Sequence, residues 1–143
     1  MTKTIDTLVE DMNNVFEHGF QDGNVPEALC EEYGRKFVEL LKTRFIREDK
    51  TGLRMSNVGK PCERQLYYEI NHKELGEKLR PETYAKFLYG DMVELLMLFV
   101  AEAAGHRVEG TQDTQEIEGI KGHRDAVIDG TIVDVKSAST YSF

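Results

Sequence analysis

The chain has 143 residues, of which 40% are hydrophobic and 31% charged, and its formal net charge is −8. These values are typical of a single globular domain and argue against a surface that coats DNA generally. No apolar run approaches the ~18 residues that a membrane-spanning helix needs, and the first residues lack the apolar stretch of a signal peptide. The cysteines, Cys30 and Cys62, are expected to be free thiols and are too few for a four-cysteine metal site.

Charge is distributed unevenly along the chain. Residues 1–34 hold eight acids and one lysine, whereas residues 35–64 hold nine basic residues and four acids. A basic segment of this kind would attract a phosphate backbone. The alternative interpretation is that these side chains form a solvated helix face.

Apolar residues at helical spacing predict helices in the first 104 residues. The expected bounds are 4–20, 26–47, 61–72 and 81–104, separated by a linker at 21–24 and loops at 48–52 and 71–80. Pro26, Pro61 and Pro81 are placed to open the later helices. The last helix is apolar over much of its circumference, which predicts that it is the central and most buried one.

Glu94 stands in the middle of that apolar run. A buried carboxylate is costly unless it is paired or bound to a metal. Gly90, one turn earlier on the same face, would let a backbone or a substrate approach closely. The alternative is that Glu94 lies on an exposed stripe with Asp91 and Glu102.

The remainder of the chain predicts antiparallel strands near 106–110 and 115–120, followed by a hairpin. Asp129-Gly130 between two runs rich in Val and Ile indicates a two-residue type I′ turn. The register then places Ile128 opposite Thr131, Val127 opposite Ile132, Ala126 opposite Val133 and Asp125 opposite Asp134. Because side chains alternate, one face would carry His123, Asp125, Val127, Ile132, Asp134 and Lys136, and the other, mostly apolar, Arg124, Ala126, Ile128, Thr131, Val133 and Val135.

Asp125 and Asp134 would therefore repel each other across the strand pair. A hard divalent cation such as Mg²⁺ would turn this repulsion into a binding site, since it takes one or two carboxylates together with phosphate oxygens. Lys136, two residues further on the same face, would reach a phosphate. The alternative is a solvated hairpin with incidental charges, and a lone His123 is usually neither a metal neighbour nor a proton carrier.

A second group of residues precedes the third helix. Ser56, Lys60 and Arg64 lie near its expected N-terminus, where free N–H groups favour anions. With Arg54 they form the expected DNA-backbone contacts. The alternative is that the helix packs through Leu66, Tyr67 and Ile70 and that Arg64 is solvated.

These residues in combination resemble the PD-(D/E)XK nuclease superfamily. The matching motifs are Gly90-x-x-x-Glu94, Gly122-x-x-Asp125 and Asp134-Val135-Lys136. The segment from Ser56 through Cys62-x-Arg64-x-x-Tyr67 resembles the RecB-type branch, which includes phage λ-exonuclease-like proteins and nucleases of CRISPR spacer acquisition. The resemblance covers about residues 56–139, so residues 1–55 are expected to be an N-terminal helical region with the basic segment and residues 56–143 the N-terminal part of the nuclease core.

The resemblance implies an α+β, restriction-endonuclease-like core: helices, a long central helix, then an antiparallel β-meander with the hairpin. It also implies that Asp125, Asp134, Glu94 and the backbone carbonyl of Val135 bind Mg²⁺ or Mn²⁺. Lys136 would orient the attacking water and stabilise charge on the phosphate during phosphodiester hydrolysis. DNA would be the substrate and the cytoplasm the location, that of a bacterial host for a phage-encoded chain.

The chain departs from this family pattern at its end. The family continues past the lysine strand with a helix, often bearing Gln-x-x-x-Tyr, and at least one strand, whereas this chain ends at Phe143. We therefore expect a second polypeptide, or another copy, to complete the fold, unless the chain is a fragment. Cys62 matches the first cysteine of an iron–sulfur cluster found in some relatives, but this chain cannot build that cluster alone.

Two functions therefore remain for comparison. The first is a Mg²⁺-dependent DNA nuclease, in particular an exonuclease of phage-type recombination or repair, or the catalytic half of a split one. The second is a non-catalytic nucleic-acid-binding or assembly subunit that keeps half of the nuclease fold. A helical domain with an incidental hairpin is the plainest alternative.

Overall fold

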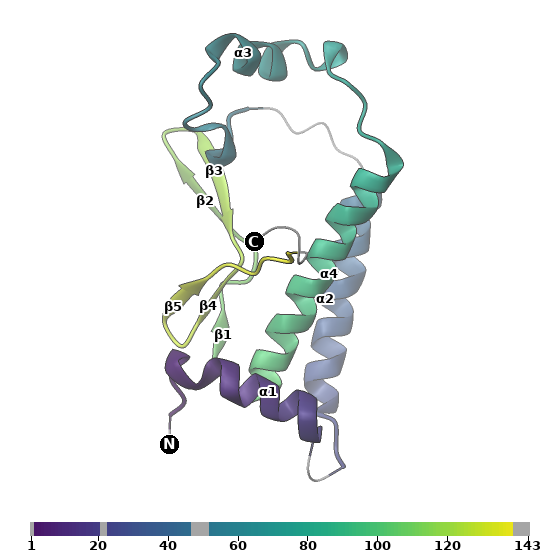
Figure 1. The fold of residues 1–143 in the computed structure, drawn as a ribbon, viewed down its shortest axis with the longest axis vertical. Helices are drawn as coiled ribbons and strands as arrows, with labels where there is room; N and C mark the ends of the chain where they lie inside the picture. Colours follow the sequence, from purple (N-terminus) through teal and green to yellow (C-terminus); the bar gives the residue numbers. More distant parts are fainter. Residues whose placement is uncertain (1, 21–22, 47–51, 139–143) are drawn as a thin grey trace.

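The computed structural model describes residues 2–20, 23–46 and 52–138, and it combines helices with small antiparallel sheets, as the α+β prediction requires (Figure 1). The helices are α1 (Leu8–His18), α2 (Glu27–Phe45), α3 (Glu63–Asn71) and α4 (Pro81–Ala103), with 3-10 turns η1 (Ile5–Thr7), η2 (Met55–Asn57) and η3 (Lys73–Leu75). The strands are β1 (Val108–Glu109), β2 (Asp113–Ile117), β3 (Ile120–Arg124), β4 (Ala126–Ile128) and β5 (Thr131–Val133). No helix in these ranges is both long and apolar enough to cross a membrane.

The long helix α4 is the axis of the fold. α2 packs along it, α1 crosses near its C-terminal end, and the strands lie to one side (Figure 1). α3 lies at the far end of the molecule from α1 and joins η2 to the start of α4 (Figure 1). The helix bounds agree with the sequence to within a few residues, and the predicted end of α2 at Arg47 falls outside the described residues.

The core lies where α1, α2 and the hairpin meet the C-terminal half of α4. Its buried side chains are Tyr33, Leu98, Ala101, Ala126 and Ile128. Ala126 and Ile128 are 0% and 2% exposed, whereas Ile132 on the opposite hairpin face is 69% exposed. The predicted apolar face of the hairpin is therefore confirmed as the face that packs on the core.

The prediction that α4 is the most buried helix is confirmed for its C-terminal half, which holds the buried Leu98, Val100 and Ala101. Its N-terminal half is more exposed, with Tyr89 at 64% and Phe87 at 44%. Three elements pack on α4. α1 crosses its C-terminal end, β1 lies just after that end in the chain, and α2 covers one side of the helix. The apolar surface of the N-terminal half is therefore only partly covered.

The strands are antiparallel, as predicted, but they do not form one continuous meander. They make a three-stranded sheet in the order β1-β4-β5 and a separate two-stranded sheet of β2 and β3. The β2–β3 hairpin is inserted between β1 and β4, so β1 pairs with β4 rather than with β2. Ala126 and Ile128 of β4 belong to the buried core, and Val108 of β1 packs against that core.

The segment before α3 lies along β3. The Lys121 N–H donates to the Leu53 carbonyl oxygen at 3.2 Å, and Arg54 pairs with Lys121 in a parallel bridge. A β-carbon at Gly122 would collide with Cγ of Met55 and lie 3.1 Å from its Cβ. Gly122 is therefore needed for this close approach of η2 to β3.

Pro81 opens α4 as predicted, whereas Pro26 and Pro61 lie slightly before their helices. Pro26 is the N-cap of α2 rather than part of its first turn. Pro61 precedes the N-cap of α3, which is Cys62, and the Cys62 Sγ accepts a hydrogen bond from the Gln65 N–H at 3.4 Å. The side chain that caps α3 is thus a cysteine, and one of the free N–H groups at this helix end already has an intrachain partner.

Candidate functional site

The hairpin register brings the two predicted metal-binding aspartates together. The ladder pairs Ala126 with Val133, Val127 with Ile132 and Ile128 with Thr131. Asp129 and Gly130 in the turn both have positive φ, 49° and 82°, as a type I′ turn requires. Asp125 and Asp134 follow as the next opposed pair, just beyond the ladder.

The two carboxyl groups have different surroundings. Asp125 Oδ2 accepts a hydrogen bond from the Val135 N–H at 2.8 Å, yet burial and the neighbouring Asp134 raise its pKa above the ordinary value. The Lys136 ammonium donates to Asp134 at 2.9 and 3.1 Å and is the main reason that the pKa of Asp134 is lowered. The Asp134 contact in turn raises the pKa of Lys136. The lysine therefore offsets part of the repulsion between the two aspartates.

Glu94 reaches this group from α4. Its carboxylate accepts a hydrogen bond from the Gln112 side-chain amide. Burial is the main cause of its raised pKa, and the charge of Asp125 is the next. Glu94 therefore belongs with the acids of the hairpin and not with a fully solvated stripe of α4. Asp91, one turn earlier on the same helix, has a different partner and is ion-paired with Arg44.

Gln112 is a residue of the site that sequence reasoning missed. Its side-chain amide contacts Glu94, and its backbone N–H donates to the carbonyl oxygen of Asp125 at 3.0 Å. It thus joins α4 to the start of β4 from the connection between β1 and β2. Gln112 has a φ of 57°, a conformation that nothing in the local sequence predicts, so no pattern marks it in advance.

Gly90 lies where the chain leaves the hairpin. A β-carbon placed there would be 3.9 Å from the Ser137 Oγ. The segment after Lys136 therefore passes α4 one turn before Glu94. The nearest atom is a side-chain oxygen at an ordinary contact distance, so a close backbone approach that requires glycine at position 90 is not seen, and the expected approach of a substrate stays a prediction.

The side chains of the site are of the type that binds a divalent cation, but only two of the three acids are adjacent. Carboxylate oxygens are the ligands that Mg²⁺ prefers, and Asp125 and Asp134 are adjacent. Among the described residues, however, no group of three His, Cys, Asp or Glu side chains is close enough to hold a metal ion. The aspartate pair is the assembled part of the donor set, and Glu94 would join it by exchanging its hydrogen bond with Gln112. The metal role of the Val135 carbonyl stays a prediction.

The four predicted DNA contacts are spread over the η2–α3 region. Ser56 and Arg54 are exposed on and beside η2. Lys60 is ion-paired with Glu69 at 2.7 Å, and the Arg64 guanidinium lies 5.9 Å from the ring centre of Tyr68. Lys60 and Arg64 thus have partners within the chain, and the role of all four in binding DNA stays a prediction.

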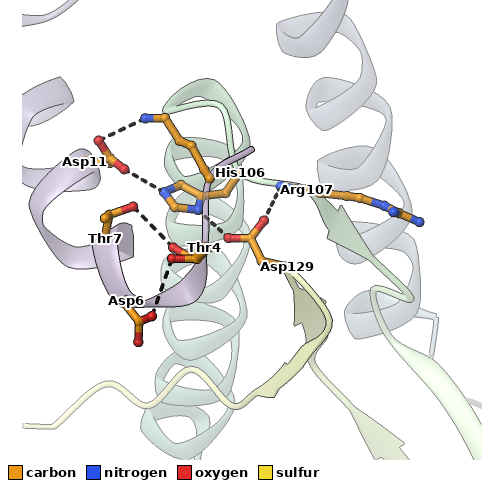
Figure 2. A network of polar contacts seen from close by, with 8 residues as sticks. Thr4, Asp6, Thr7, Asp11, His106, Arg107 and Asp129 are labelled. Carbon is orange, nitrogen blue, oxygen red and sulfur yellow. Dashed lines mark hydrogen bonds and ion pairs between the residues drawn. The ribbon is translucent and has the colours of Figure 1, made fainter. Parts of the chain in front are cut away.

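A second polar cluster, which the sequence did not reveal, surrounds His106 (Figure 2). The His106 side chain is fully buried, with Nδ1 2.6 Å from Asp129 Oδ2 and Nε2 3.1 Å from Asp11 Oδ2. Asp11 also pairs with Lys3 at 2.9 Å. This cluster fixes the hairpin turn to α1 and so positions the aspartates at the other end of the hairpin. His123, by contrast, contacts Thr114 at 3.1 Å on the β2–β3 hairpin.

Comparisons of the chain with models of protein families, with curated proteins and with solved structures found no match.

Proposed function

We propose that this chain is a divalent-metal-dependent DNA nuclease, or the catalytic half of one, of the PD-(D/E)XK type that its motifs resemble. The observation that supports this most is the hairpin register, which brings Asp125 beside Asp134. Lys136 contacts Asp134, and Glu94 lies within electrostatic reach of both aspartates. Three acids and a lysine from separate elements thus converge where the apolar face of the hairpin ends.

The role of each residue follows from its position. Asp125, Asp134 and Glu94 would hold Mg²⁺ or Mn²⁺ together with the Val135 carbonyl. The bound ion would supply a lowered water pKa and offset the charge of the phosphate. Lys136 is 77% exposed and its surface pair with Asp134 is weak, so its ammonium is able to turn to a phosphate oxygen or to orient the attacking water.

Cleavage of linear DNA in the presence of Mg²⁺ tests this proposal. We expect Asp134→Ala and Lys136→Ala to reduce the rate by about 100-fold or more. Lys121→Ala is the matched control, because Lys121 is likewise an exposed lysine that contacts an acid, Glu116, at 3.8 Å, and it should cleave normally. Normal cleavage by Asp134→Ala would show that the site lies elsewhere. Calorimetric titration with Mn²⁺ adds a second readout, in which Asp125→Asn should weaken binding.

The second candidate is a non-catalytic nucleic-acid-binding or assembly subunit. The absence of a ready three-residue metal group among the described residues favours it. It predicts salt-sensitive DNA binding through the basic segment 35–64. It also predicts no cleavage with any divalent metal, including after addition of a partner, and no heat of binding with Mn²⁺.

We also propose that another polypeptide, or a second copy, completes the sheet. β5 stands at the end of the strand order, so within the described ranges no strand pairs with its outer edge. Its Ile132 is 69% exposed. An uncovered edge is a site for pairing with another strand. Sedimentation analysis should detect self-association of the full chain, and Ile132→Lys should reduce it; a monomer at all concentrations would leave a separate polypeptide as the remaining partner to test by co-expression.

A further inference from the structure

A cavity of about 960 Å³ lies between the end of α2, the start of α4 and the η2–α3–η3 segment. It is separate from the aspartate pair of the hairpin, which does not line it. Its size is in the range of small-ligand sites. The residues around it combine aromatic and cationic side chains.

One wall of the cavity is aromatic. Phe45, Tyr84 and Phe87 line it, and they are 70%, 37% and 44% exposed. The Arg44 guanidinium lies 5.7 Å from the ring centre of Phe87 and is held there by its ion pair with Asp91. Exposed rings beside a fixed guanidinium are suited to stacking of a planar ring.

The remaining wall is cationic. Lys42, Arg44, Arg54 and Lys73 line the cavity, and the single carboxylate among the lining residues, Glu69, is already paired with Lys60 at 2.7 Å. Lys42 is paired with the exposed Glu39 in the preceding turn, and such a surface pair costs little to exchange. In a chain with a net charge of −8, this local excess of positive charge favours an anionic occupant.

The cavity adjoins the acidic site through Arg44. Its partner Asp91 lies on α4 one turn before Glu94. The pKa of Arg44 is raised mainly by Asp91, with a smaller contribution from Glu94. A chain-like ligand that occupies the cavity would therefore continue toward the acids.

We propose that this cavity binds unpaired nucleotides of a nucleic-acid strand, with a base stacked on Phe87 and Tyr84 and phosphates on Arg54 and Lys42. Aromatic platforms beside cationic groups are the general means of binding single strands without sequence preference. The proposed binding of the strand depends only on the residues that line the cavity. The proposal that the bound strand reaches Asp125 and Asp134 rests, in addition, on the proposed nuclease function.

The test uses the full chain in EDTA, so that binding is measured without cleavage. The probe is a fluorescein-labelled 12-nucleotide oligo-dT, followed by anisotropy, and a second oligonucleotide carries 2-aminopurine to report stacking. We expect Arg54→Glu to weaken binding roughly tenfold and to lower its salt dependence. Phe87→Leu, which keeps an apolar side chain, should abolish the 2-aminopurine quenching. Circular dichroism checks that each variant folds.

Controls separate this proposal from the others. Arg107→Glu makes the same charge change at an exposed position outside both the cavity and the basic segment 35–64, and it should bind as the parent does. Loss of cleavage and loss of strand binding are distinguishable, because Asp134→Ala should stop cleavage in Mg²⁺ without weakening strand binding in EDTA. The proposal is overturned if Arg107→Glu weakens binding as much as Arg54→Glu, or if quenching survives Phe87→Leu. It is also overturned if a free nucleoside monophosphate competes as well as the oligonucleotide, since that would identify a small-molecule site.

Discussion

Replacement of His106 by leucine tests whether the buried cluster holds the hairpin in place. Both ring nitrogens contact carboxylates, and the Asp129 side chain is only 8% exposed. Without the imidazole, the Asp129 carboxylate still accepts the hydrogen bond from the Arg107 N–H at 3.0 Å, but it loses its shorter contact, that with His106 Nδ1 at 2.6 Å. Asp11 is 26% exposed and keeps Lys3. The greater part of the loss should therefore fall on Asp129.

The size of the effect follows from these surroundings. A hydrogen bond to a charged, nearly buried group contributes about 1.5–3 kcal/mol, and the more exposed Asp11 contact adds little to this. We expect the free energy of unfolding to fall by about 2–3 kcal/mol, a large part of the ~5–15 kcal/mol of a typical domain. For a chain of this length the corresponding fall in Tm is about 6–9 °C.

Urea unfolding followed by far-ultraviolet circular dichroism measures this, because the chain has no tryptophan. Asp129→Asn keeps a residue that tolerates the positive φ and an Asn-Gly turn, but removes the charge. In the Asp129→Asn background, His106→Leu should lower the free energy of unfolding by at least ~1 kcal/mol less than it does in the parent. His18→Leu, at the exposed end of α1, is the matched control and should stay within ~0.5 kcal/mol of the parent. A His106→Leu protein as stable as the control, or costs that simply add, would refute the reasoning.

Three further predictions concern pH and packing. The contacts from His106, and then from the Arg107 N–H, hold the pKa of Asp129 below its ordinary value. The Asp129 carboxylate therefore stabilises the fold at neutral pH, and this contribution is lost as the pH falls through the lowered pKa. The urea midpoint of Asp129→Asn should accordingly depend less on pH below about 4 than the midpoint of the parent does. Burial raises the pKa of Glu94 above its ordinary value of 4.5 and so disfavours the ionised form. Glu94→Gln should therefore be more stable than the parent at pH 7–8 and lose that advantage as the pH falls through the raised pKa toward 4.5; it should also bind Mn²⁺ more weakly. Gly122→Ala should cost about 1–3 kcal/mol by overpacking against Met55, and Met55→Ala should recover part of that cost in the double variant; equal stability of Gly122→Ala and the parent would show that η2 does not pack on β3.

Local sequence patterns were sufficient for the helices, for the β4–β5 turn and for the central pair of the site, but not for the β2–β3 hairpin, whose turn at Glu118 and Gly119 falls inside a predicted strand. The apolar spacing of Leu8 and Met12 and the long run of α4 identified helices because one face of each must be buried. Asp129-Gly130 defined the turn, and a two-residue turn defines the register. The adjacency of Asp125 and Asp134 follows from that register alone, since opposed residues of a hairpin are neighbours whatever surrounds them.

Contacts between distant segments were decided only by the tertiary structure. The pairing of β1 with β4 joins Val108 to Ile128 across an inserted hairpin, and no local signal specifies it. The same holds for His106, whose partners Asp11 and Asp129 lie 95 and 23 residues away. Each of these contacts depends on burial against α4, which is a property of the assembled fold.

The sequence by itself thus determined the helices, the hairpin and the opposition of Asp125 to Asp134, because these depend on interactions between residues near in the chain. The tertiary structure decided that Gln112 joins Glu94 to the hairpin and that α4 is buried only toward its C-terminal end. It also decided that aromatic and cationic side chains from three segments enclose one cavity. These features depend on which surfaces meet, and periodicity along a single element carries no information about its partner.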